Sequence, residues 1–307
     1  MSVYSNNRFN KAAENEAWSK IFKFIPAKSR ILDVGCSSGK LGEALKKEKD
    51  VYVVGLDIDA ADVELAKKNL DEAFVLNAEH DDLESLGRFD VIIMADVVEH
   101  LVDPVGVLKK LKPLLKAQGR FVFSIPNMAN VTTRIEVLRG RFEYKDFGLL
   151  DRTHLHFYDE EEVNRVLRAS GFEVVKTDCT IREIPESILE KSLGEIGITL
   201  TPQLMSYLND TNALIYQFIG YAQPTRKPSR FHPETTSPLD VVSQSIDELN
   251  AKHQQELEEK NQKIQYWQSE YKRVVAELGQ ILNSKGWKLL SRVFDAKARA
   301  GKSSKNN

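Results

Sequence analysis

The sequence has few cysteines and no long apolar run. Cys36 and Cys179 are its only two cysteines and lie far apart, which argues against a disulfide framework or a cysteine metal site and favours a reducing compartment. Residues 1–20 are polar and lack the apolar core of a signal peptide. No stretch reaches the roughly eighteen apolar residues that a membrane span requires. These absences predict a cytoplasmic protein.

The sequence also lacks an excess of charge of either sign. Its formal net charge is -2 although 29% of the residues are charged, whereas a nucleic-acid-binding domain is typically strongly basic. Nucleic acid is therefore not an expected partner. The length of 307 residues, of which 42% are hydrophobic, suits one α/β domain of about 200–250 residues with an appendage.

Short apolar runs alternate with helical patterns over the first two thirds of the chain. Helical spacing marks residues 40–47, 62–70 and 104–115, and a helical insertion is expected at 185–209. The runs that predict strands are 31–34, 51–56, 73–76, 89–94, 120–125, 172–177 and 213–221. This alternation predicts an α/β fold with a doubly wound, mainly parallel, seven-stranded sheet over residues 1–221.

The composition changes after Tyr221. Residues 222–238 contain four prolines among polar residues, which predicts a linker. Residues 239–283 carry apolar positions at alternating steps of three and four, a spacing typical of a coiled-coil helix. Residues 284–307 carry seven Lys or Arg against Asp295, with Trp287, Leu290 and Phe294 on one face. This basic amphipathic tail suits contact with an anionic membrane surface, or a solvated helix end.

The strongest chemical signal is the turn after the first strand, which reads Asp33-Val-Gly35-Cys-Ser-Ser-Gly39-Lys-Leu41. A Walker A loop needs four residues between its glycines and a Ser or Thr after the lysine, and this turn has neither. A dinucleotide-binding loop would carry a middle glycine, which Ser37 replaces here. Asp33 would also repel a pyrophosphate. Neither phosphate-binding scheme fits.

This Asp-x-Gly-x-x-x-Gly pattern resembles motif I of class I S-adenosylmethionine-dependent methyltransferases. The resemblance implies S-adenosylmethionine as cofactor, a phosphate-free cation that an acid at the strand end favours. Three further tracts match the family in order, and the resemblance covers roughly residues 15–180. Asp57 and Ile58 end the second strand, where the acid would accept the ribose hydroxyls. The implied donor-site residues at the ends of the first two strands are Asp33, Gly35, Cys36, Gly39, Asp57 and Ile58. The adenine turn adds Asn77, Ala78 and Glu79, and the end of the fourth strand adds Ala95.

The tract Asp96-Val-Val-Glu99-His100 resembles that of ubiquinone-biosynthesis and small-RNA O-methyltransferases, in which it is associated with a divalent metal. Its spacing would place the three polar side chains on one helical face. Either His100 or His154, beside Glu99, is a candidate general base for methyl transfer to a hydroxyl. Alternatively Asp96, Glu99, His100 and His154 would hold Mg²⁺ or a softer metal. In the non-catalytic interpretation, Glu99 and His100 cap a helix and bond the loop that carries His154.

Residues 124–154 resemble bacterial methyltransferases associated with surface polysaccharides. The resemblance implies a helical lid at 127–150 that carries Arg134, Arg139, Arg141 and Tyr144 towards an acidic acceptor. It predicts O-methylation of a sugar hydroxyl in glycan or glycolipid synthesis. The alternatives are a small phenol or quinone acceptor, a non-catalytic scaffold and, more remotely, a nicotinamide oxidoreductase. The tail predicts self-association or a partner helix, with peripheral contact to the inner face of the membrane.

Overall fold

The structure is a computed structural model that describes Ala13 and residues 15–208, 211–225 and 238–303. The chain divides into two compact units, Met1–Phe231 and His232–Asn307. None of the described helices is both long and apolar enough to cross a membrane.

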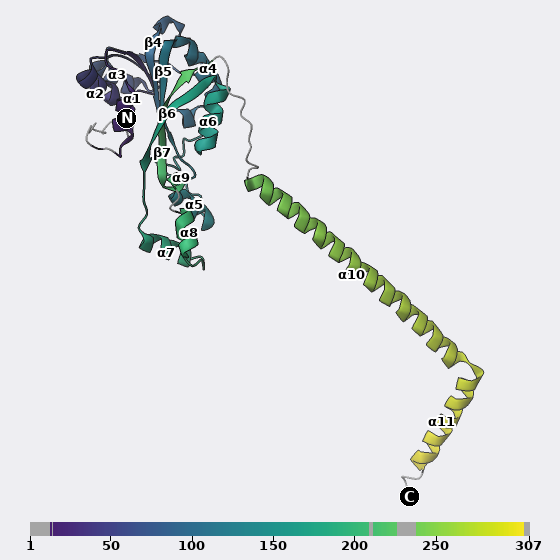
Figure 1. Cartoon of the computed structure of the whole chain (residues 1–307). Coiled ribbons are helices and arrows are strands. Elements are labelled where there is room, and N and C mark those ends of the chain that lie inside the picture. The colour runs from purple at the N-terminus through teal and green to yellow at the C-terminus, as the bar shows by residue number, and fades with distance from the viewer. Residues whose placement is uncertain (1–12, 14, 209–210, 226–237, 304–307) are drawn as a thin grey trace. The chain divides into compact units, whose positions relative to one another are not determined.

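Seven strands form one sheet in the order β3-β2-β1-β4-β5-β7-β6, and helices cover both of its faces (Figure 1). The first five strands pair in parallel, and β7 is antiparallel to both β5 and β6. The strands are β1 Arg30–Val34, β2 Tyr52–Asp57, β3 Glu72–Val75, β4 Phe89–Ala95, β5 Leu115–Pro126, β6 Phe172–Ile181 and β7 Ile215–Pro224. The predicted seven-stranded, mainly parallel sheet is confirmed. Because β7 continues to Pro224, the first residues of the predicted linker belong to the sheet.

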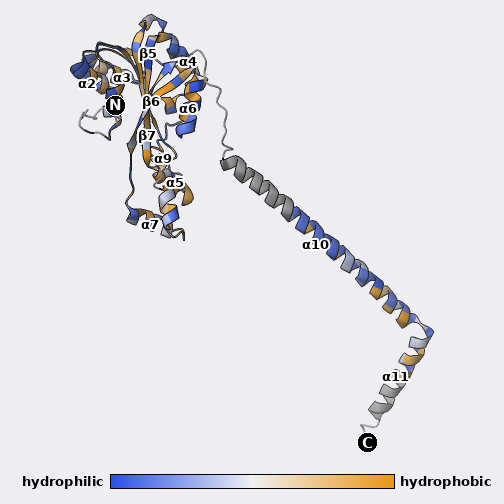
Figure 2. Cartoon of the chain, viewed as in Figure 1, coloured by the Kyte–Doolittle hydropathy of each residue, from blue (hydrophilic) through white to orange (hydrophobic). Residues whose placement is uncertain are grey.

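The two faces of the sheet are buried under different helices. Successive side chains of a strand point to opposite faces, so Ile31 joins one core cluster with α1–α3 and Leu32 joins another with α4 and α6. Hydrophobic residues accordingly run along the central strands (Figure 2). The helices are α1 Ala17–Phe24, α2 Lys40–Lys49, α3 Ala60–Asn69, α4 Pro104–Leu111 and α6 Glu160–Ala169.

A smaller cluster forms where α5 (Val131–Leu138) meets the insertion between β6 and β7. The insertion contains α7 Glu186–Gly194, α8 Pro202–Leu208 and α9 Thr211–Leu214, and its core includes Ile135, Leu189 and Leu193. The expected helical lid over 127–150 is wrong, because helix α5 ends at Leu138. Gly140 adopts φ +70° there, and the amides of Gly140 and Arg141 bond the carbonyls of Val137 and Glu136. This pattern is a Schellman motif, which ends the helix.

The C-terminal unit contains two helices, α10 Pro238–Asn283 and α11 Lys285–Ser303. They meet at Ser284, whose Oγ accepts a hydrogen bond of 3.2 Å from the amide of Trp287 and so caps α11. A helix over 239–283 with a break before the basic tail matches the sequence pattern. The pairing of that helix in a coiled coil stays a prediction. Residues 226–237, most of the predicted linker, lie outside the described residues.

Candidate functional site

The turn between β1 and α2 depends on left-handed backbone conformations. Gly35 and Gly39 adopt φ +74° and +75°. A Cβ on Gly35 would lie 2.5 Å from Cγ2 of Val97, so that position admits glycine alone without displacement. Ser37 also has a positive φ of 46°, a backbone conformation that costs a non-glycine residue free energy. Its Oγ donates to Oδ2 of Asp62 at 2.9 Å, which holds the serine in place.

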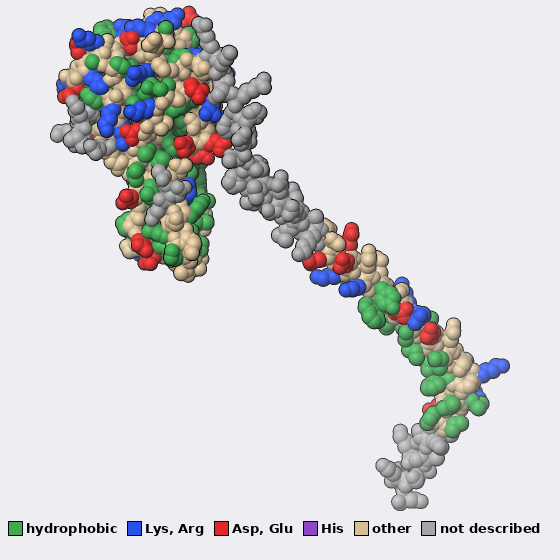
Figure 3. All heavy atoms as spheres, in the orientation of Figure 1, with side chains coloured by type: hydrophobic (Ala, Val, Ile, Leu, Met, Phe, Trp, Pro, Cys, Tyr) green, Lys and Arg blue, Asp and Glu red, His purple; other side chains and the backbone are tan. Residues whose placement is uncertain are grey.

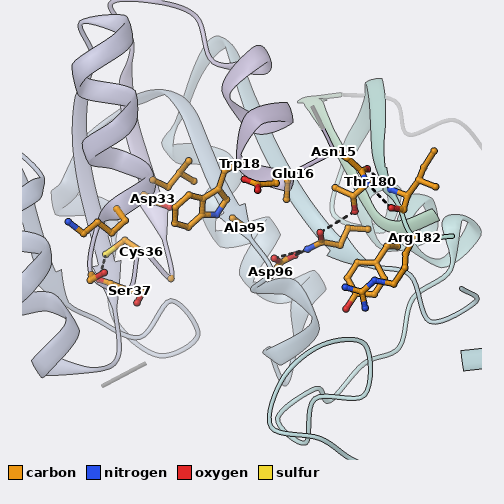
Figure 4. A pocket seen from close by; sticks show the side chains of 18 residues that line it. Asn15, Glu16, Trp18, Asp33, Cys36, Ser37, Ala95, Asp96, Thr180 and Arg182 are labelled. Atoms are coloured by element: carbon orange, nitrogen blue, oxygen red, sulfur yellow. Dashed lines mark hydrogen bonds between the residues drawn. The ribbon is translucent and has the colours of Figure 1, made fainter. Parts of the chain in front are cut away.

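A cavity of about 720 Å³ opens beside this turn (Figure 4). The turn and the end of β4 form one side with Trp18 beside Asp33, and Asn15 with the ends of β6 and β7 forms the other. Four of the predicted donor-site residues line the cavity, namely Asp33, Gly35, Cys36 and Ala95. The strand ends therefore converge on one hollow, as a doubly wound sheet requires of its ligand site.

Asp33 is the acid at the centre of this wall. Its side chain is buried, and its Oδ2 has no hydrogen-bond partner among the described residues. Burial, assisted by the charge of Asp57, raises the pKa of Asp33 to about 7. A buried carboxylate oxygen without a partner is costly unless a ligand supplies a donor. Asp33 therefore fits the ammonium group of an amino-acid ligand. Burial also raises the pKa of the Cys36 thiol, which keeps that residue protonated.

Asp57, at the end of the neighbouring strand β2, accepts hydrogen bonds that stabilise the turn. Its Oδ2 accepts from the amide of Ser37 at 2.7 Å and its Oδ1 from the amide of Asp59 at 2.9 Å. Asp57 does not line the cavity, although its charge acts on Asp33. Each carboxylate oxygen keeps a second lone pair, so the acid can still accept ribose hydroxyls. The adjacent side chain of Ile58 is exposed.

The predicted adenine turn lies after β3 and does not line the cavity. Oδ1 of Asn77 accepts from the amide of Glu79 at 2.8 Å, and Ala78 is buried in the core. Oε1 of Glu79 accepts from the amides of Val102 and Asp103, at 2.9 and 3.1 Å. The carboxylate of Glu79 thus anchors the segment before α4.

The expectation that Asp96, Glu99 and His100 share one helical face is wrong. Val98–His100 is a single 3₁₀ turn, and Asp96 lies before it with φ +54°. The amide of Asp96 still bonds the carbonyl of Ser124 on the neighbouring strand, so the chain turns sharply before any helix can begin. The carboxylate of Asp96 lines the cavity and accepts from Oγ of Ser124 at 2.9 Å. Burial raises its pKa.

Three of the four predicted metal ligands nevertheless come together. Glu99, His100 and His154 each offer one ligand atom, and these three atoms lie within 4.8 Å of one another. Asp96 is outside this group. Glu99 is fully buried, and neither of its carboxylate oxygens has a hydrogen-bond partner in the described part of the chain. Burial, and then the charge of Asp96, raises the pKa of Glu99 well above its usual value. We call Glu99, His100 and His154 the Glu-His-His group.

The two imidazoles of the group are oriented by the loop after α5. Nδ1 of His154 lies 3.2 Å from the carbonyl oxygen of Leu149. Since a carbonyl only accepts, Nδ1 carries the proton and Nε2 is left with a lone pair. Burial lowers the pKa of His154, which favours this neutral form. Nδ1 of His100 lies 3.1 Å from the carbonyl of Thr153, and the two rings meet edge to face at 4.8 Å.

The non-catalytic interpretation is realised in part. The carbonyl of Glu99 accepts from the amides of Leu155 and His156, at 2.8 and 3.1 Å, and Nδ1 of His100 bonds the carbonyl of Thr153, so both residues fix the loop that carries His154. The Glu99 carboxyl takes no part in this contact. His156 points elsewhere, with Nε2 3.4 Å from the carbonyl of Val102. The Glu-His-His group does not itself line the cavity. Asp96 does line the cavity, and its charge acts on Glu99.

Sequence reasoning missed several residues that line the cavity, namely Asn15, Trp18, Thr180, Arg182, Tyr216 and Gln217. These residues come from the N-terminal segment and from the last two strands, outside any motif. The arginines expected on a lid do not line the cavity. Arg139 pairs with Glu136 at 2.9 Å and with Glu195, and Nε of Arg134 bonds the carbonyl of Ala129.

Comparisons with known proteins identify the family of this chain. Residues 5–177 match the family described as "Methyltransferase domain". Ubiquinone biosynthesis O-methyltransferase of Coxiella burnetii is 34% identical over 102 residues, which are 32% of this chain and 43% of that protein. Its namesake in Acinetobacter baylyi is 29% identical over 108 residues, 33% of this chain and 45% of that protein. The chain thus spans less than half the length of these curated relatives.

Among solved structures, a SAM-dependent methyltransferase from Archaeoglobus fulgidus has a TM-score of 0.48 and 20% identity, over 67% of this chain and 91% of that chain. Magnesium protoporphyrin IX methyltransferase from Synechocystis has a TM-score of 0.44 and 14% identity, over 72% of this chain and 88% of that chain. The family match covers more than half of the sequence and includes the glycine turn. The chain therefore belongs to the methyltransferase domain family, among the class I S-adenosylmethionine-dependent methyltransferases.

Proposed function

We propose that the chain is an S-adenosylmethionine-dependent O-methyltransferase that acts on a sugar hydroxyl in glycan or glycolipid synthesis. The observation that carries this choice of acceptor is the polar wall opposite Asp33, which includes Thr180, Arg182 and Gln217. Thr180 and Gln217 bond each other and Asp96, so the N–H groups of Arg182 are the donors that this wall offers to a polyhydroxylated ring, whereas a prenylated quinone would be better served by apolar side chains.

Donor binding uses the residues of the first wall. S-Adenosylmethionine, when bound, supplies the methyl group on a sulfonium. The unpartnered Oδ2 of Asp33 would accept from the ammonium of this ligand, and Asp57 would accept from its ribose. Gly35 lines the cavity, and its lack of a side chain lets its backbone lie against Val97.

Methyl transfer forms an O–CH₃ bond as the S–CH₃ bond breaks, and the acceptor hydroxyl must lose its proton. His154 and His100 are the proposed proton acceptors, because Nε2 of His154 has a free lone pair and burial favours the neutral ring. Alternatively, the Glu-His-His group would hold a divalent cation, which would supply Lewis-acid polarisation of the acceptor oxygen. Neither oxygen of buried Glu99 has a hydrogen bond among the described residues, and its Oε1 lies 4.0 Å from Nε2 of His154, which favours this second role. Two imidazoles suit a softer cation than Mg²⁺.

The second candidate acceptor is a catechol of the quinone type, because the curated relatives are described as ubiquinone biosynthesis O-methyltransferases. Transfer of a labelled methyl group to panels of glycans, sugar phosphates and catechols separates the two. Labelling of sugars alone supports the proposal, and labelling of catechols alone reverses it. If donor binds but no methyl group is transferred to any panel, the scaffold alternative gains.

The C-terminal helices are proposed to bind a second copy of the chain or a partner helix. Hydrophobic side chains gather along one edge of the later part of α10 (Figure 3). The exposed seam residues are Leu257, Ile264, Trp267, Tyr271, Val274, Leu278 and Ile281. Peripheral membrane contact of α11 is a separate proposal. Flotation of the full chain with anionic vesicles, against a chain that ends at Asn283, tests it, and equal flotation rejects it.

A further inference from the structure

Arg182 is an unusual residue of the cavity wall because its charge is not neutralised there. Its guanidinium lies over the ring of Tyr216, 3.9 Å from the centroid. Among the described residues no carboxylate forms an ion pair with it, whereas Arg30, Arg139, Arg152, Arg165 and Arg273 all have carboxylate partners. Lys40, which also lines the cavity, pairs with Glu43 at 3.0 Å.

The position of Arg182 is fixed by the backbone around it. It follows directly after β6, and its amide bonds the carbonyl of Leu214 at 2.9 Å. The preceding residue, Ile181, exchanges two hydrogen bonds of 2.8 Å with the side-chain amide of Asn15. A ring beneath the guanidinium holds its plane while leaving the N–H groups at its edge available.

The charges of the cavity are separated in space. Asp33 and the glycine turn lie on one side, Arg182 and Thr180 lie on the other, and Asp96 is between them (Figure 4). The acidic side suits a cationic donor. A planar guanidinium at the opposite side matches the geometry of a phosphate or carboxylate, which it can bind through two parallel hydrogen bonds.

We propose that Arg182, supported by Tyr216, binds an anionic group of the acceptor, a phosphate or a carboxylate, and so selects acidic or phosphorylated sugars over neutral ones. This inference rests on the proposed function, because it places the acceptor in the half of the cavity that faces the donor wall. The donor also carries a carboxylate, which is the other anion that Arg182 could meet. The experiment must separate these two sources.

The test is calorimetry on the full chain saturated with S-adenosylhomocysteine, with glucose 1-phosphate, inorganic phosphate, glucuronate and glucose as probes. We expect Arg182→Gln to weaken binding of glucose 1-phosphate about tenfold to a hundredfold, as for loss of a hydrogen bond to a charged group. Arg182→Lys, which keeps the charge, should fall between. Arg165→Gln removes an exposed arginine that pairs with Glu162, away from the cavity, and should change nothing.

Each other outcome has a distinct meaning. Equal binding of glucose 1-phosphate by wild type and Arg182→Gln overturns the inference, as does a wild type that binds S-adenosylhomocysteine but neither a phosphate probe nor glucuronate, the matching carboxylate sugar. If Arg182→Gln weakens S-adenosylhomocysteine and leaves 5′-methylthioadenosine unchanged, the arginine binds the donor's carboxylate instead. A wild type that binds no S-adenosylhomocysteine refutes the proposed function itself.

Discussion

The carboxylate of Asp96 accepts two hydrogen bonds, each of 2.9 Å, from the side-chain amide of Gln217 on β7. Oε1 of Gln217 in turn accepts from Oγ1 of Thr180 at 3.2 Å, which fixes the amide so that its nitrogen faces Asp96. These contacts hold a non-glycine residue with φ +54° at the centre of the cavity. Backbone strain of this kind persists only where surrounding contacts over-determine it.

Replacement of Gln217 by Leu should therefore destabilise the fold by about 1–3 kcal/mol, because it leaves a buried acceptor without its donor. The proposed methyl transfer should also slow, because Asp96 would no longer be held. Thermal unfolding and labelled-methyl transfer measure the two effects. Gln223→Leu is the control on the same strand, since its side chain makes only a long 3.5 Å contact with the carbonyl of Gln118. Equal losses in both variants would contradict the proposed role of the contact between Gln217 and Asp96.

Donor affinity should depend on pH through Asp33. Its pKa of about 7 means that the carboxyl is largely protonated at pH 6, and only the carboxylate attracts an ammonium. We expect S-adenosylhomocysteine to bind about tenfold more weakly at pH 6 than at pH 8. Asp33→Asn should bind weakly at both values, without this slope. Calorimetry at the two pH values measures the effect, and a wild-type affinity that does not change with pH would remove Asp33 from the donor site.

The same shift in pKa has a consequence for the ligand-free protein. Because folding raises the pKa of Asp33, its contribution to stability is present at low pH and is lost as the pH rises from about 4 towards 7. Asp33→Asn should therefore unfold at a higher temperature than wild type at pH 8, and the difference should shrink at pH 5. Thermal scans without ligand measure this. A variant less stable than wild type at pH 8 would show that the unpartnered carboxylate is not a source of instability.

Glu99→Gln tests the Glu-His-His group as a metal site. Burial raises the pKa of this carboxyl well above its usual value, so the isosteric amide should change the unfolding temperature little. It should nevertheless weaken binding of Mn²⁺ or Co²⁺, measured by calorimetry, by at least about tenfold. Glu162→Gln, at an exposed ion pair on α6, is the control. Equal ion affinity in wild type and Glu99→Gln would leave only the general-base role, which separate His100→Gln and His154→Gln variants then test by turnover.

Two glycines with nearly the same backbone conformation allow the cost of backbone strain to be measured separately from the cost of side-chain crowding. Gly35 and Gly140 have φ +74° and +70°, but a Cβ at Gly140 would meet nothing within 4 Å. Gly140→Ala should cost about 1 kcal/mol of stability from φ alone, and Gly35→Ala should cost at least about 1 kcal/mol more because of Val97. Chemical denaturation measures the difference. Val97→Ala should partly rescue Gly35→Ala, and a failure to rescue would place the crowding elsewhere.

The seam of α10 predicts association through Ile264. Ile264→Lys places a charge on the apolar stripe and should shift the full chain towards monomer in sedimentation or light scattering. Gln265→Lys adds the same charge one residue away, off the stripe, and should leave the mass unchanged. A wild-type chain that is monomeric at all concentrations would refute self-association and leave a different partner helix as the proposal.

The elements of the sheet were predictable because their signals are local. Buried strands such as 31–34 and 89–94 are short apolar runs between helical patterns, and a strand that ends at Asp33 before two glycines predicts the turn. The pattern of residues 239–283 similarly predicts a helix, since every turn repeats the same spacing. The sequence alone therefore determined the fold class, the donor-site turn and the separation of the C-terminal helices.

Only the tertiary structure decided which side chains share the cavity. Arg182, Tyr216 and Gln217 reach it because β7 inserts antiparallel between β5 and β6, and no local pattern encodes that pairing. The hydrogen bond from the amide of Asp96 to the carbonyl of Ser124 on β5 likewise keeps Asp96 out of a helical register, and Glu99 meets His154, which is far along the chain. Local spacing fixes the conformation of a segment, whereas the contacts between segments are set by burial of the whole sheet.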